Sequence, residues 1–122
     1  MSEHRKHFEI RENCVAILDR DHWMCRYIDA KGNHCRQSAT EIAHGISQGE
    51  SMTSIIRTQW NGEFNESRPY NWIQRNVIHN PLNVFSSCRK HNDYFNIGNN
   101  PGAVRERLYA IREQLKKQGV IK

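Results

Sequence analysis

Residues 40–46 (TEIAHGI) and 83–92 (NVFSSCRKHN) are the two stretches of this sequence that decide its fold. The first is short and semi-apolar, which predicts a strand that carries His44 and ends or bends at the following glycine. In the second, either of the two serines before Cys88 can cap a helix that runs to about residue 96. The remainder of the chain is expected to hold these two segments against each other.

Cysteine and histidine spacing predicts a metal site that joins two distant parts of the chain. Cys88 and His91 form a Cys-x-x-His pair, and thiolates combined with one imidazole suit tetrahedral Zn²⁺. Cys25 and Cys35 flank the turn sequence 31–33 (KGN), which predicts a small hairpin or knuckle that presents both sulfurs inward. A closed set of four ligands leaves no open position, so such a zinc would be structural and would contribute to folding.

Two alternatives to this ligand set follow from the residues. The cysteines can be buried thiols beside a surface histidine, with no metal bound. His34 can replace His91 as the fourth ligand, because it lies next to Cys35. Cys14 falls on the apolar side of a helix expected over residues 5–19, which favours core packing over metal binding.

Length and composition limit the class of protein. The chain has 122 residues, which predicts one domain with one modest core, and its apolar fraction of 37% is low enough that a structural metal would help to stabilise it. The net charge of +5 favours polyanionic partners, nucleic acid first. Residues 1–7 (MSEHRKH) are charged and lead into no apolar run, so we expect a cytosolic protein without a signal peptide or membrane span.

The outer parts of the chain are expected to flank this site. A final helix is predicted from Pro101, with Asn100 as its cap and one apolar stripe that continues until Gly119: Val104, Leu108, Ile111 and Leu115. Residues 77–85 (VIHNPLNVF) alternate imperfectly around a proline, which predicts an edge strand or an extended loop. The polar segment before them allows a short helix over residues 52–60.

In their order along the chain, these motifs resemble the HNH, or ββα-metal, endonucleases that carry a zinc knuckle. The residues concerned are 18–21 (LDRD) before the first cysteine, 41–44 (EIAH), Asn83, and Cys88-x-x-His91 followed by Asn92. The likeness covers about residues 14–97 and is nearest to a phage-type branch of the family. It implies an α+β fold with a ββα-metal core, a structural zinc knuckle and flanking N- and C-terminal helices.

The resemblance also implies roles for individual residues. His44 matches the general base that deprotonates the attacking water, and Asn83 matches the asparagine that ties the loop together and orients that histidine. Asn92 matches a ligand of the catalytic divalent cation, Mg²⁺ or Mn²⁺. The four residues that match the zinc knuckle are Cys25, Cys35, Cys88 and His91.

One position departs from the family pattern. The residue before the base is normally Asp or His and binds the catalytic cation, whereas Ala43 has no ligand atom. His79 is the preferred replacement, since the second segment is expected to lie beside the first strand. Glu41 is the alternative, because it shares a strand face with Ala43 if the strand is regular.

These expectations amount to a single HNH-like domain over residues 1–122, with an insertion over about residues 47–76 between its two core strands. The expected function is metal-dependent DNA endonuclease in a bacterial or phage-infected cytoplasm. The alternatives are a catalytically inactive zinc-stabilised DNA-binding module and a protein-interaction adaptor. The insertion offers cations and aromatic side chains that either contact DNA or form a small satellite core: Arg57, Trp60, Arg68, Tyr70, Trp72 and Arg75.

Overall fold

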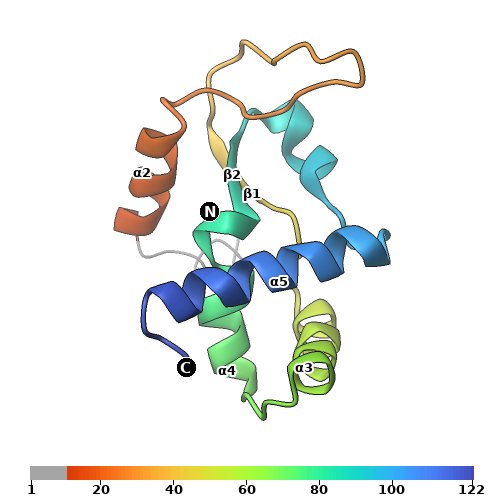
Figure 1. Ribbon diagram of the computed structural model, residues 1–122. Helices are drawn as coiled ribbons and strands as arrows, with labels where there is room; N and C mark the ends of the chain where they lie inside the picture. The colour runs from red at the N-terminus through yellow and green to blue at the C-terminus, as the bar shows by residue number, and fades with distance from the viewer. Residues whose placement is uncertain (1–10) are drawn as a thin grey trace. The chain divides into compact units, whose positions relative to one another are not determined.

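The computed structural model describes residues 11–122, with side chains from Cys14 onward (Figure 1). Contacts divide this part of the chain into two compact units. Unit 1 comprises residues 11–45 and Val84–Asn96, and unit 2 comprises Ile46–Asn83 and Ile97–Lys122. In chain order, the first elements are α2 (Arg11–Arg20), β1 (Glu41–His44), α3 (Glu50–Phe64), α4 (Tyr70–Ile73) and the π-helical turn η1 (Gln74–Ile78). They are followed by the 3₁₀ turn η2 (Pro81–Asn83), the strand β2 (Val84–Ser87), the 3₁₀ helix η3 (Arg89–Phe95) and α5 (Pro101–Lys117).

Unit 1 is built on an antiparallel pair of strands. β1 pairs with β2 so that Glu41 lies opposite Ser87 and His44 opposite Val84. The strand expected over residues 40–46 is therefore confirmed in its central part, and it ends before Gly45. Figure 1 shows α2 and η3 on either side of this strand pair.

The face of the sheet toward α2 is apolar. Ile17 of α2 packs against Val84, and Cys14 and Ile42 join this cluster. Cys14 is thus a core residue, as its helical position predicted. The expected helix over residues 5–19 is observed from Arg11, and residues 5–10 lie outside the described part of the chain.

The opposite face of the sheet contacts η3. Phe85 of β2 stacks on Phe95 with ring centroids 5.1 Å apart, and Glu41 forms an ion pair with Arg89. Because Phe85 pairs with Ala43, strand alternation places Glu41 and Ala43 on this face and His44 on the other. The helix expected after Cys88 is present as a 3₁₀ helix.

Unit 2 has its own hydrophobic core. The apolar stripe predicted for α5 is confirmed, since Val104, Leu108, Ile111 and Leu115 are all buried in it, and Asn100 caps the helix by accepting from the Ala103 N–H at 3.1 Å. The segment expected as an insertion supplies Ile56, Trp60 and Ile73 to this core, and the remaining members are Ile46, Val77, Ile78 and Ile121. Its cations mostly serve the fold, as Arg68 lies 4.5 Å from the ring centroid of Trp72 and pairs with Glu66.

The strand or extended loop expected over residues 77–85 is wrong for most of its length. The chain stays helical through Ile78 and forms the 3₁₀ turn η2, and only Val84 onward enters the strand β2. Asn80 stabilises this path, because its Oδ1 accepts from the Leu82 N–H at 2.9 Å and its Nδ2 donates to Asn76 and Gln114. No helix within residues 11–122 is long and apolar enough to span a bilayer.

Candidate metal centre

Cys25 and Cys35 are held by the hairpin that the sequence predicted. The Cys25 N–H donates to Gln37 O at 3.0 Å, and the Cys35 N–H donates to Tyr27 O at 2.9 Å. These bonds accompany two isolated antiparallel bridges in the hairpin, one between Met24 and Ser38 and one between Ile28 and His34. Pairing of the hairpin arms therefore brings together two cysteines that are separated by nine residues in the sequence.

The turn of this hairpin is organised by Asp29. Its carboxylate accepts from the N–H groups of Lys31 and Asn33, both at 2.9 Å, and these bonds lower the pKa of Asp29. Gly32 has a φ of +85°, a left-handed conformation that a side chain would disfavour. The Lys-Gly-Asn sequence thus forms the turn expected of it.

Cys88 and His91 come from the junction between β2 and η3. Cys88 is the residue before η3, and the His91 N–H donates to Cys88 O at 3.2 Å. This tight turn carries the imidazole back over the thiol. This geometry explains why the Cys-x-x-His spacing suits two ligands of one metal ion.

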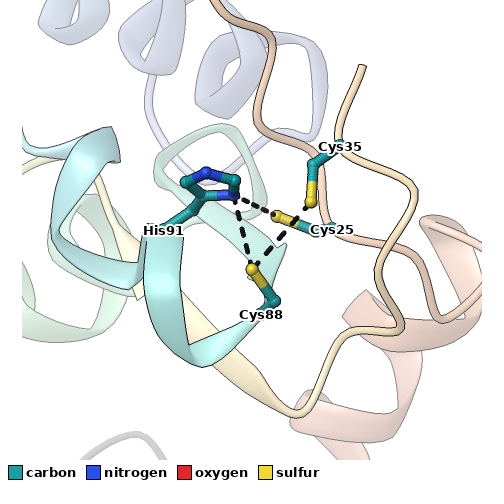
Figure 2. Close-up of side chains that lie close together, drawn as sticks. All are labelled: Cys25, Cys35, Cys88 and His91. Atoms are coloured by element: carbon teal, nitrogen blue, oxygen red, sulfur yellow. Dashed lines mark hydrogen bonds between the residues drawn. The ribbon is translucent and has the colours of Figure 1, made fainter.

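All four predicted ligands converge on one point (Figure 2). Their ligand atoms lie within 4.8 Å of one another. His91 Nδ1 is 3.4 Å from Cys88 Sγ and 3.7 Å from Cys25 Sγ, and Cys35 Sγ is 4.0 Å from Cys88 Sγ. Among the described residues, this is the one group of at least three His, Cys, Asp or Glu side chains that could hold a metal ion.

These separations fit tetrahedral zinc. Bond lengths of about 2.3 Å for Zn–S and about 2.05 Å for Zn–N give tetrahedral edges of about 3.8 Å between sulfurs and about 3.5 Å between sulfur and nitrogen. The observed distances scatter around these values. Three thiolates and one imidazole are also the soft donor set that zinc prefers. The set is closed, so a bound zinc would stabilise the fold and would not bind substrate.

The two buried thiols differ in their readiness to ionise. Burial raises the pKa of Cys25. Burial also opposes ionisation of Cys88, but hydrogen bonds from the His91 N–H and from neighbouring thiols outweigh it and lower the Cys88 pKa.

Aromatic packing orients the imidazole. Tyr27 stacks on His91 with ring centroids 4.2 Å apart and an interplanar angle of 25°, and Tyr94 contacts both rings edge-on. Nδ1 of His91 is directed at the thiols. His34, the alternative ligand, is exposed and does not belong to the cluster.

His44 and Asn92 both belong to the strand pair and its adjoining 3₁₀ helix. His44 is half-buried and is the last residue of β1. The Asn92 side chain donates from Nδ2 to Ile42 O at 3.5 Å, which directs it to the backbone of β1 two residues before His44. Ala43 lies between these two β1 positions, is 1% exposed, and brings no ligand atom.

Asn83 is a fully buried amide in unit 2. Its Oδ1 accepts from the Ile46 N–H at 2.8 Å and from Arg107 at 3.2 Å, and its Nδ2 donates to Ile46 O at 3.1 Å and to Ile78 O at 2.8 Å. The side chain thereby fixes the backbone at Ile46, two residues after His44 in the chain. The role that the resemblance implied for Asn83, to tie the loop together and orient His44, stays a prediction.

His79 does not belong to the residues of the second segment that pair with β1, which was the reason to prefer it as a cation ligand. It follows η1 in unit 2 and precedes the residues of β2 that pair with β1. The edge strand or extended loop expected over residues 77–85 is not formed at His79, which lies in a turn after η1, and its role as a ligand stays a prediction. Glu41, the alternative, is on the η3 side of β1 and pairs with Arg89 at 3.6 Å.

Asp21 has a structural role that the sequence did not reveal. Its buried carboxylate accepts from Arg20 at 2.8 and 2.9 Å, from Arg26 at 2.7 Å and from the Ser86 N–H at 2.9 Å. Burial opposes ionisation, but these donors lower the Asp21 pKa far below its usual range. The bond to Ser86 attaches the start of the hairpin to β2, a contact that local sequence does not signal.

Comparison with known proteins adds no relative to these observations. No protein-family model, curated protein or solved structure matches the chain.

Proposed function

We propose that this chain is a metal-dependent DNA endonuclease of the HNH type, stabilised by zinc at Cys25, Cys35, Cys88 and His91. One observation carries the proposal. A strand that ends in His44, its antiparallel partner and a following 3₁₀ helix with Asn92 directed at the first strand occur together in one compact unit. The candidate zinc ligands lie at the junction of the second strand and that helix.

In the proposed reaction, His44 acts from the end of β1. Its neutral imidazole accepts a proton from a water molecule that attacks the phosphorus of a phosphodiester bond. Strand alternation places His44 on the opposite face of the sheet from Glu41, which begins the four-residue strand that His44 ends. The proposal therefore assigns the base to His44 alone, as the last residue of β1.

The residues between β1 and η3 fit a hard cation in their donor chemistry. Asn92 is held through its Nδ2, which leaves its amide oxygen for a ligand, and Glu41 supplies a carboxylate whose partner Arg89 is loosely held at 3.6 Å. Amide and carboxylate oxygens are donors that Mg²⁺ and Mn²⁺ accept. The bound cation would stabilise negative charge on the phosphate as the bond breaks.

The test is cleavage of supercoiled plasmid by zinc-loaded protein in Mg²⁺ or Mn²⁺. Wild type should nick the plasmid, and His44→Ala should abolish nicking because no base remains to activate water. His34→Ala is the matched control, since it removes an exposed imidazole outside the cluster. Persistent cleavage by His44→Ala with the zinc content unchanged would exclude His44 as the base.

A catalytically inactive DNA-binding module is the second candidate, and Ala43 favours it. This residue faces η3, where the family pattern supplies a cation ligand, and it is buried at 1% exposure. The two candidates predict different plasmid results. Salt-sensitive DNA binding without cutting by either wild type or His44→Ala would favour the module.

A further inference from the structure

Every segment that contributes to the metal cluster has an exposed cation directly after a cysteine ligand. Consecutive Cα atoms are about 3.8 Å apart, and the ligand atoms converge within 4.8 Å. The backbone positions of these cations therefore lie within two residues of a ligand in unit 1, although they come from three segments of the sequence. We call them the knuckle cations: Arg26, Arg36, Arg89 and Lys90.

The knuckle cations are directed largely to solvent. The side chain of Arg89 is 92% exposed, and its ion pair with Glu41 is long at 3.6 Å. Arg26 is 49% exposed although it reaches Asp21. Within the described residues, no carboxylate forms an ion pair with Arg36 or Lys90.

Arginines of unit 2 provide the contrast. Arg105 pairs with Glu63 at 2.8 Å and Arg112 pairs with Glu66 at 2.6 Å. Arg112 also lies 4.8 Å from the ring centroid of Phe64. These cations are used within the fold, whereas among residues 11–122 no ion pair is formed by Arg36 or Lys90.

A simpler explanation is that the knuckle cations balance the negative charge of the thiolates. Three thiolates, a neutral imidazole and one Zn²⁺ carry a net charge of about −1, which a nearby cation would stabilise. Arg26 and Arg89 pair with Asp21 and Glu41, and the other two knuckle cations, Arg36 and Lys90, still exceed that single negative charge. A side chain as exposed as Arg89 also gains little from a partly buried charge, because water screens the interaction.

We propose that the knuckle cations form a phosphate-contacting surface for nucleic acid on the outside of the metal centre. This proposal rests on the proposed function for the identity of the partner. Guanidinium and ammonium groups are the usual partners of backbone phosphates, and a closed metal site would hold them in fixed positions. Tyr94, which is 58% exposed as a residue and packs edge-on against His91, offers an aromatic side chain for a base or sugar near the same ligands.

Salt dependence of DNA binding tests this surface. Affinity would be measured by fluorescence anisotropy across salt concentrations, with zinc-loaded protein and no added Mg²⁺ or Mn²⁺. For the double variant Arg36→Gln/Lys90→Gln, the slope of log affinity against log salt should fall by about 0.9 for each lost phosphate contact, so by about 1.8 in total. The control Lys117→Gln/Lys122→Gln removes two exposed charges from unit 2 and should keep the wild-type slope.

Three results would contradict the proposal that the knuckle cations contact phosphates. Equal slope losses in the two double variants would mean that only net charge matters. An unchanged slope in Arg36→Gln/Lys90→Gln would exclude phosphate contacts, and loss of zinc from that variant would mean that the cations serve the thiolates.

The same measurements separate this surface from the nuclease proposal. A wild-type protein that binds with the predicted slope changes but never cuts would leave the surface standing without the nuclease. If wild-type protein cuts the plasmid but the double variant binds DNA with an unchanged salt slope, the nuclease proposal would stand without the phosphate-contacting surface. Absence of DNA binding at low salt would contradict both the phosphate-contacting surface and the nuclease proposal.

Discussion

Asp21 is a buried carboxylate on which two guanidinium groups and a backbone N–H converge. Its replacement by asparagine should lower the free energy of unfolding by about 3 kcal/mol, because the arginines and Ser86 lose a charged acceptor. Denaturant unfolding followed by circular dichroism measures this change. Asp93→Asn, which removes an exposed carboxylate from η3, is the control and should stay within about 0.5 kcal/mol of wild type.

The low pKa of Asp21 also fixes how this contribution depends on pH. A carboxyl group whose folded-state pKa is depressed stabilises the protein above its unfolded pKa of about 3.9, and that stabilisation is lost as the pH falls toward the folded value. The stability difference between wild type and Asp21→Asn should thus be complete above about pH 5 and shrink below it. A difference that grows on acidification would contradict this account.

Asn83 contributes to unit 2 through four hydrogen bonds of one buried amide. Asn83→Ala should destabilise this unit by about 3 kcal/mol, since buried groups at Ile46 and Ile78 lose their partners. Unfolding can be followed by the fluorescence of Trp60 and Trp72, which both belong to unit 2. The control is Asn71→Ala, which changes an exposed asparagine and should keep the wild-type unfolding midpoint. The same unchanged midpoint for Asn83→Ala would mean that water replaces the hydrogen bonds of the Asn83 amide.

Single residues differ in how well the sequence reveals them. The four cluster residues could be predicted because their donor chemistry and the Cys-x-x-His spacing are local signals. Asp21 could not, because its role depends on the Ser86 N–H, 65 positions away. Tyr27 was missed for the same reason, since only the fold brings its ring onto His91.

At the scale of elements, the hairpin around residues 25–35 and the β2–η3 junction are joined by the metal cluster. Zinc-finger peptides gain about 10–16 kcal/mol from zinc, which is comparable to the whole stability of a domain. Removal of the metal by a chelator should therefore unfold unit 1 at room temperature. The measurement is near-ultraviolet circular dichroism together with the fluorescence of Trp23, which lies in this unit.

Two cysteine variants control this experiment. Cys35→Ser should reproduce the effect of the chelator, because it removes a ligand. Cys14→Ser should retain one zinc per chain, since this equally half-buried thiol packs beside Ile17 and takes no part in the cluster. Folded, metal-free Cys35→Ser would show that the cluster is dispensable.

Elements with local signals could be predicted, and those set by tertiary contacts could not. The Asn100 cap, Pro101 and the apolar stripe of α5 are all readable in the sequence. The run Val77-Ile78 resembles a strand by propensity, but both side chains are buried in the core of unit 2 on a helical turn. Packing there overrides the local preference.

At the scale of the molecule, the sequence indicated one modest core, and the described chain contains two compact units. The core of unit 2 could be predicted only in part, through the stripe of α5 and Trp60, because its members are dispersed from Ile46 to Ile121 among polar residues. Their proximity depends on contacts between distant segments, which periodicity cannot report. The candidate metal site of unit 1 could be predicted, because the Cys-x-x-His pair and the turn between Cys25 and Cys35 are local signals.

Plasmid cleavage in ¹⁸O-labelled water tests the central claim most directly. If His44 activates water, wild-type protein should incorporate one solvent oxygen into the terminal phosphate at each cut, as measured by mass spectrometry of the ends, and His44→Ala should give no product. Intact plasmid with fully zinc-loaded wild type, or equal labelled product from His44→Ala, would contradict the account.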